Sequence, residues 1–265
     1  MTRSHDMIIK LRRKLNHFQR DVRWRSGFGR QGFNSTRRGR ILVYHGICLS
    51  DHHRYNTLFL TLKTFEKQIQ LYKKHFNIIS LNDFYEERFS KNKFSVCLTF
   101  DDGFANNYKY VLPLLEKNQV PASFFVTSIR NTGYDFLWND MLSIAHRHGP
   151  SKFNFRNEEF IKSPDGSYLS STTKMFLSDM LRHESFESKA SLIDVLGSFF
   201  SLKEKAHEDY WLQMSKEQIR SLAASKWVTI GSHSYYHNDL AKIPVSDLKA
   251  DVEGSKQYLE NIIQK

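Results

Sequence analysis

The sequence predicts an α/β fold built on a parallel sheet. Strand-length apolar segments alternate with amphipathic helical segments along residues 41–126, the order typical of parallel strands joined by crossover helices. One segment, Ser95–Phe100, ends abruptly at the acidic turn Asp101–Gly103, as expected of a buried strand that carries acidic groups at its carboxyl end. A second strand-like segment, within residues 227–238, also ends in polar side chains.

The first half of the chain is expected to contain four strands and three helices. Strands are expected at 41–44, 77–81, 95–100 and 122–126, and helices at 62–76, at 82–89 and after Gly103. Pro113 lies inside the last of these helical patterns. Because proline lacks a backbone N–H and is tolerated in the first helical turn, it is expected to kink this helix or to restart it.

A long insertion is expected before the second polar strand. About one hundred residues separate Val126 from Val228, where one crossover helix would suffice, so residues 131–214 are assigned to a mixed helical and β-hairpin insertion. Its expected elements are a helix at 136–148, a β excursion at 152–170 and two helices at 171–184 and 187–202. The segment Ser215–Gln218 fits a capping box that opens the next helix, and a last helix is expected at 247–262.

The net charge of +11 is concentrated at the N-terminus. Residues 1–40 hold twelve Lys or Arg and two Asp, which leaves about +1 for residues 41–265. The chain is therefore divided into a basic N-terminal arm, 1–40, and a nearly neutral domain, 41–265. Few aromatic residues lie between the basic residues of the arm, so nucleic acid is not an expected partner.

The arm has two interpretations. Its apolar residues recur at helical spacing opposite basic residues, which favours either a helix on an anionic membrane surface or a helix packed on the domain and followed by a basic linker. No apolar core of signal-peptide length follows the basic residues, and no run of 18 apolar residues occurs in the sequence. A cytoplasmic location is therefore expected, peripheral at the inner membrane face if the arm binds lipid.

Histidines and aspartates at the ends of the two polar strands predict a metal site. Asp102, or Asp101, forms with His233 and His237 a set of two imidazoles and one carboxylate. Three protein ligands leave coordination positions open, which is typical of catalytic sites, and the other aspartate is then free to act as a base. The acidic turn alone also fits a solvated strand-to-helix turn, and the two histidines alone have many explanations unrelated to a metal. Both motifs at the ends of strand-like segments, in this order, favour the metal site.

Four motifs place this arrangement among known proteins. They are T-F-D-D-G at Thr99–Gly103, H-S-x-x-H at His233–His237, Y-H-G at Tyr44–Gly46 and P-A-S-F-F at Pro121–Phe125. With them the sequence resembles the polysaccharide deacetylase family, carbohydrate esterases that share a domain with the nodulation-factor chitooligosaccharide deacetylases. The resemblance covers residues 41–265 with a gap in the middle.

The resemblance implies a fold, a reaction and a set of roles. The fold is a distorted (β/α) barrel of the polysaccharide deacetylase type, and the reaction is metal-dependent N-deacetylation of an N-acetylated carbohydrate. By position, Asp101 is the catalytic base, and Asp102, His233 and His237 hold a divalent metal, with Zn²⁺ expected. Asp101 would take a proton from the water that attacks the acetamide.

Two further residues are candidates for contact with the substrate. His45 follows the first strand, where it either lies beside the metal site and contacts substrate or is hydrogen-bonded within its own loop. Trp138 either borders the substrate groove or packs in the core of its helix. His45 and Trp138 are therefore candidates for substrate binding.

The resemblance does not reach the last motifs of the family. There, a strand with an arginine-and-proline motif and a later histidine that acts as general acid follow the last helix, whereas no histidine follows His237 here. The barrel is therefore expected to be incomplete at its C-terminal end, and we expect metal binding with weak or absent turnover. Two alternatives stay open: a metal- or carbohydrate-binding relic without turnover, and a membrane-surface binding module that acts through the basic arm.

Overall fold

The computed structural model describes residues 19, 22, 33 and 38–264 of the chain. Almost all of the N-terminal arm predicted at residues 1–40 lies outside these residues, and so do its predicted helix and linker. Within the described part, no helix is both long enough and apolar enough to cross a lipid bilayer.

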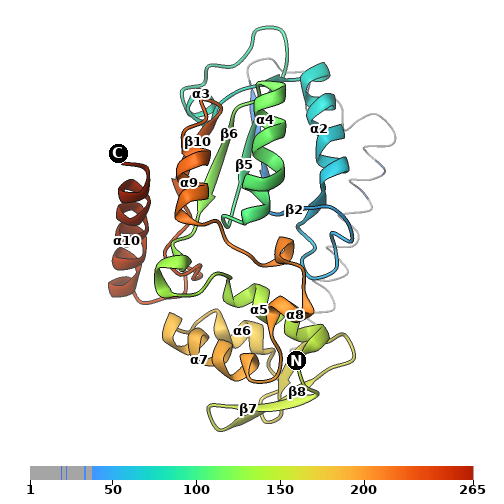
Figure 1. The fold of residues 1–265 in the computed structure, drawn as a ribbon, viewed down its shortest axis with the longest axis vertical. Helices are drawn as coiled ribbons and strands as arrows, with labels where there is room; N and C mark the ends of the chain where they lie inside the picture. The colour runs from blue at the N-terminus through green and yellow to red at the C-terminus, as the bar shows by residue number, and fades with distance from the viewer. Residues whose placement is uncertain (1–18, 20–21, 23–32, 34–37, 265) are drawn as a thin grey trace.

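A parallel sheet forms the centre of the fold, which confirms the predicted α/β class (Figure 1). Its main path runs β1 (Gly39–Tyr44), β5 (Ser95–Phe100), β6 (Ala122–Val126) and β10 (Val228–Ser232), and β4 (Asn77–Ile78) pairs with the start of β5. All of these pairings are parallel, so the carboxyl ends of the strands meet at one edge. Within residues 38–264 no pairing joins β1 to β10, and the described sheet is open.

An aromatic stack fixes the register of the sheet directly below its carboxyl edge. Tyr44 pairs with Phe100, and Phe100 pairs with Phe124, on three neighbouring strands. The ring centroids of Phe100 lie 5.2 Å from those of Tyr44 and 4.8 Å from those of Phe124, in stacked geometry. His45 and Asp101, which follow Tyr44 and Phe100 along the chain, therefore emerge side by side. All six residues of β5 are buried, which explains why its sequence is a nearly continuous apolar run.

Helices cover the sheet and bury a first hydrophobic core. They are α2 (Leu62–His75), α4 (Leu112–Asn118), α9 (Lys216–Ala223) and α10 (Val245–Ile263). The short helix α3 (Leu81–Tyr85) contacts β5 but contributes no residue to this core. A π-helical turn, η2 (Asn107–Val111), leads into α4, whose first turn contains Pro113, so the proline restarts the helix as one of the two predicted alternatives. The predicted capping box is present at Ser215, where the side chain of Gln218 bonds back to the cap.

The predicted strand at 77–81 and the helix after it are shorter than expected. Only Asn77 and Ile78 pair with β5, and Leu81 opens α3 instead of closing the strand. The reason is local: the side chain of Ser80 accepts the N–H of Asp83 and caps the helix one residue earlier.

A second group of elements lies below the carboxyl edge of the sheet in Figure 1. We call residues 136–211 the lobe. It contains α5 (Trp138–His148), the antiparallel strands β7 (Lys152–Phe155), β8 (Glu158–Lys162) and β9 (Tyr168–Ser170), and α6 (Leu177–Leu181), α7 (Phe186–Gly197) and α8 (Leu202–Lys205). These elements enclose a second hydrophobic core that includes Phe153, Phe160 and Tyr168.

The helix predicted at 171–184 is wrong in extent, because only Leu177–Leu181 is α-helical. Side chains take the backbone donors that a helix would otherwise use. Ser170 Oγ accepts the N–H of Thr173 at 2.8 Å, and Glu158 Oε1 accepts the N–H of Thr172 at 3.0 Å. Such local bonds compete with helix formation and favour the observed turn.

Candidate metal centre

The first ligand candidate stands in a strained turn at the end of β5. Asp102 has a φ of 74° and Gly103 a φ of 83°, both in the left-handed region. A Cβ on Gly103 would lie 2.8 Å from Val126 Cγ1, so this position requires glycine for its space as well as its conformation. Left-handed backbone is costly for a residue such as aspartate and concentrates at functional sites.

The two histidines lie in a turn that follows β10. The N–H of His233 donates to Val126 O at 3.0 Å, which continues the pairing with β6 past the end of the strand. Ser234 and His237 have φ values of 68° and 54°, and the N–H of His237 donates to Ser234 Oγ at 3.0 Å. This compact turn, and not a helix, brings two side chains four positions apart to the same side.

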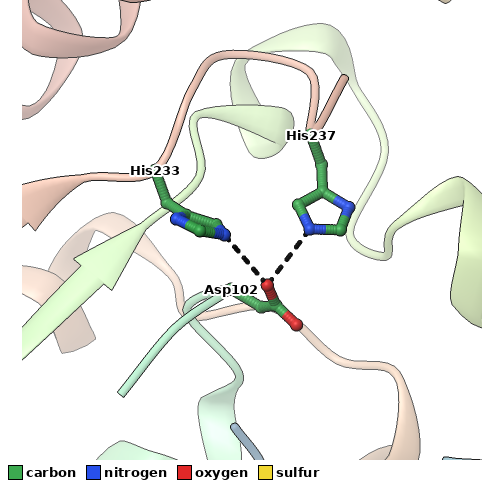
Figure 2. A group of neighbouring side chains, drawn as sticks. All are labelled: Asp102, His233 and His237. Atoms are coloured by element: carbon green, nitrogen blue, oxygen red, sulfur yellow. Dashed lines mark ion pairs between the residues drawn. The ribbon is translucent and has the colours of Figure 1, made fainter. Parts of the chain in front are cut away.

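Figure 2 shows the carboxylate of Asp102 between the two imidazoles. Asp102 Oδ1 lies 3.3 Å from His233 Nε2 and 3.1 Å from His237 Nε2. One ligand atom of each residue lies within 4.8 Å of the others. Two ligand atoms about 2.0–2.1 Å from one tetrahedral ion are roughly 3.3 Å apart, so these contacts fit a shared divalent cation.

The electrostatics of the group favour an ionised carboxylate. Burial raises the pKa of Asp102, but the contacts from His233 and His237 outweigh this effect and hold the pKa well below its usual range. Burial lowers the pKa of His233, whereas the contact with Asp102 and the charges of Asp102 and Asp101 raise it above its usual value. A cation bound here would lie beside the Asp102 carboxylate in place of an Nε2 proton, because an imidazole nitrogen must be deprotonated to bind a metal.

Asp101 is not a member of this three-residue group. Of the two aspartates that the residues alone left open, Asp102 is the one whose carboxylate lies beside both histidines. Asp101 is half-buried at the end of β5. Burial raises its pKa, while the imidazoles of His233 and His45 oppose the shift. A carboxylate with a raised pKa beside a cation site suits a general base.

His45 emerges next to Asp101 at the carboxyl edge. The N–H of Asp101 donates to Tyr44 O at 2.9 Å, so the residues that end β1 and β5 are neighbours. The electrostatic interaction with His45 acts to lower the pKa of both Asp101 and Asp102. A Cβ on Gly46 would overlap the ring of Phe59 at 2.3 Å, which explains why glycine follows this histidine.

Helix α5 of the lobe contacts the second histidine. The indole N–H of Trp138 donates to His237 O at 3.1 Å, and Asn139 Oδ1 lies 3.1 Å from His237 Nδ1. The ring of Trp138 also packs against the core of the lobe. A role for Trp138 in substrate binding stays a prediction. The contact of Asn139 was not predicted, and only its position beside Trp138 hints at it.

Asp140, the next residue of α5, is 2% exposed, and its Oδ2 has no hydrogen-bond partner within the described residues. Burial raises the pKa of Asp140 well above its usual value, and the negative charge of Asp102 adds to the shift. Both effects favour the neutral form of the Asp140 carboxyl group.

Several solved structures are similar to this chain. IcaB from Ammonifex degensii is 16% identical over 86% of this chain and 70% of that one, with a TM-score of 0.47. The Streptococcus pyogenes deacetylase PplD in complex with acetate is 17% identical over 87% and 71%, with a TM-score of 0.46. A de-N-acetylase from Aggregatibacter actinomycetemcomitans is 15% identical over 86% and 76%, with a TM-score of 0.46. No curated protein sequence matches significantly.

The family comparison is more informative. The family model described as polysaccharide deacetylase matches residues 89–150 and 194–265, which together make up just over half of the chain. The matched ranges include Asp101, Asp102, His233 and His237, whereas the hairpin strands of the lobe fall in the unmatched stretch between them. The chain therefore belongs to the polysaccharide deacetylase family and is a hydrolase that acts on N-acetyl groups of carbohydrates.

Proposed function

We propose that the protein is a metal-dependent N-deacetylase, which hydrolyses an acetamide on a carbohydrate to a free amine and acetate. One observation carries the proposal: Asp102, His233 and His237 converge on one point, with Asp101 beside them, in a chain of the deacetylase family. Convergence of this kind requires two strand ends separated by more than one hundred positions to meet, which makes an accidental cluster a poor explanation.

Asp102, His233 and His237 would hold the cation, and Zn²⁺ suits two imidazoles and one carboxylate that leave further positions open. The bound cation would supply Lewis acidity, which makes a water more acidic and polarises the acetamide carbonyl. The lowered pKa of Asp102 serves this role, because an ionised carboxylate is available as a ligand at neutral pH.

Asp101 is proposed as the general base. It takes the proton of the water whose oxygen attacks the acetamide carbon. Burial raises its pKa and so makes the carboxylate a stronger proton acceptor than an exposed aspartate. Asp101 is not one of the three residues that would hold the cation, so its carboxylate is proposed to accept this proton.

His45 is proposed as the proton donor to the leaving amine. A donor is needed because the carbon–nitrogen bond breaks with its electron pair on nitrogen, and an amine anion is a very poor leaving group. His45 lies at the end of β1, beside Asp101 and within electrostatic reach of Asp102. The sequence-based expectation that turnover lacks a proton donor is untested, and His45 is proposed as an alternative to it.

Acetate release from N-acetylated chitooligosaccharides by residues 1–265, loaded with Zn²⁺, tests the proposal. Asp101→Asn should abolish release while leaving Zn²⁺ binding near one per chain. His45→Ala should lower kcat by about 10²–10⁴-fold, the usual contribution of a general acid.

The rival functions give different results. Bound Zn²⁺ without acetate release from any N-acetyl sugar would favour a binding relic. Unchanged turnover in Asp101→Asn would contradict the assigned base, and unchanged turnover in His45→Ala would contradict only the assigned proton donor.

A further inference from the structure

We infer that Asn139 is a positioning residue for the metal ligand His237. In this assignment, which rests on the proposed metal site, Asn139 Oδ1 accepts the Nδ1 proton of the imidazole and so leaves the Nε2 lone pair available to a cation held between His237 and Asp102. Helix α5 of the lobe is then part of the metal centre, and not only a cover for the sheet.

The geometry of the imidazole carries this inference. His237 Nδ1 lies 3.1 Å from Asn139 Oδ1, and His237 Nε2 lies 3.1 Å from Asp102 Oδ1. A neutral imidazole has one N–H, and only the nitrogen without it can bind a cation. An acceptor at Nδ1 therefore selects the tautomer that leaves Nε2 free for the metal.

The backbone of His237 is held from the same helix. The indole N–H of Trp138 donates to His237 O at 3.1 Å. Lys189 of α7 lies 5.1 Å above the Trp138 ring and donates to Asn238 Oδ1 at 2.6 Å. The backbone and the ring of His237 are thus each held by a residue of α5, and rotation of the imidazole away from Asp102 would break the contact with Asn139.

The strength of such a partner sets the expected effect. Loss of an outer hydrogen-bond partner of a metal-bound histidine typically lowers metal affinity by about 10–100-fold. Asn139→Leu removes the acceptor at similar size and should show this loss. Asn139→Asp keeps an acceptor at the same place and should bind Zn²⁺ within about 3-fold of the wild-type protein if the acceptor is the cause.

Competition with a chromophoric chelator measures the Zn²⁺ affinity of residues 1–265 and of each variant. Asn154→Leu serves as the matched control, because Asn154 is an exposed residue of β7 in the same lobe. Circular dichroism and thermal unfolding of the metal-free proteins report whether each variant keeps the fold. The inference requires a selective affinity loss in Asn139→Leu, with an unfolding midpoint close to that of the wild-type protein.

Three outcomes would overturn it. Equal affinities of the wild-type protein and Asn139→Leu would show that the acceptor is dispensable. Equal losses in Asn139→Leu and Asn139→Asp would show that the effect comes from disturbed packing. A wild-type affinity no higher than that of Asp102→Asn would remove the metal site itself, and only this third outcome contradicts the proposed function.

Discussion

The sheet and the lobe contribute to the same site by different physical means. The sheet supplies Asp101, Asp102 and His233 through main-chain register, because parallel strands end at a common edge. The lobe supplies side-chain contacts, from Asn139 to the ring of His237 and from Lys189 to the turn that follows it. Groups that bind or react thus follow from backbone pairing, whereas groups that hold them in place depend on tertiary packing between distant segments.

The largest difference between the two regions should appear on truncation of their cores. Phe124 of β6 and Phe160 of β8 are 1% and 0% exposed. Phe124→Ala and Phe160→Ala should each lower the free energy of unfolding by about 3–5 kcal/mol. Under native conditions, only Phe124→Ala should also weaken Zn²⁺ binding, because its ring stacks on Phe100 directly below the acidic turn.

Urea unfolding and Zn²⁺ titration of both variants check this expectation. Equal weakening of Zn²⁺ binding by Phe160→Ala would mean that the lobe core controls the site as strongly as the sheet does. That result would remove the distinction between the two regions.

Lys189 of the lobe should make the free energy of unfolding depend on pH. Burial lowers its pKa from 10.5 to about 8, and the negative charges of Asp239 and Asp251 oppose the shift only in part. Between pH 8 and 10.5 the unfolded chain therefore binds the additional proton. The free energy of unfolding should rise with pH in this window, by up to about 1.4 kcal/mol per pH unit.

Urea unfolding of the metal-free protein from pH 7 to pH 10 measures this slope. Lys189→Met should remove the contribution, so the free energy of unfolding of the wild-type protein should rise relative to that of Lys189→Met as the pH rises. Parallel curves for the two proteins would show that Lys189 carries its proton in the folded state throughout this range.

Replacement of glycine by alanine should cost more stability in the strained acidic turn than in the lobe. Gly103→Ala should lower the free energy of unfolding by about 1–3 kcal/mol, because the left-handed backbone and the contact with Val126 both oppose a side chain. Gly197→Ala is the matched control at the end of α7, where a Cβ would meet no atom within 4 Å. It should be neutral or stabilising by up to about 1 kcal/mol. Chemical denaturation measures the free energy of unfolding of both variants. Equal changes in the two would argue against strain at the acidic turn.

The smallest effect is expected at a helix cap. Ser215→Ala should cost about 1 kcal/mol, because it leaves the N–H of Gln218 without its cap at the start of α9. Ser191→Ala, within α7 of the lobe, should be neutral or slightly stabilising, since alanine has the higher helix propensity. Thermal unfolding resolves the two, and a destabilisation of similar size in Ser191→Ala would contradict this reasoning.

Most of the sheet could be predicted from local patterns. Strand β5 is buried on both faces, so its apolar run is unbroken, and the capping box before α9 is a purely local signal. The helix predicted at 171–184 is shorter than expected because Glu158, on strand β8, accepts the N–H of Thr172. Bonds of that kind depend on the tertiary fold and leave no periodic signal.

The site divides in the same way. The two histidines and an adjacent aspartate, Asp102 or Asp101, could be predicted because their spacing and position after strands are visible in the sequence. Only the family resemblance favoured Asp102, and the role of these residues as ligands stays a proposal. The approach of His45 to Asp101 needed the pairing of β1 with β5, which the sequence does not specify. Asn139 and His237 lie 98 positions apart in the sequence, and no local sequence pattern predicts their contact.

Strand β6 lies between the two strands that carry the proposed ligands. Asp102 follows β5 and His233 follows β10, and neither strand pairs with the other. An ion held by both would act as a clip across three strands and bind the native chain but not the unfolded one. At 100 times its dissociation constant such an ion adds about 2.7 kcal/mol to stability. Demetallation by a chelator and loosening of this end of the sheet should therefore be one coupled event.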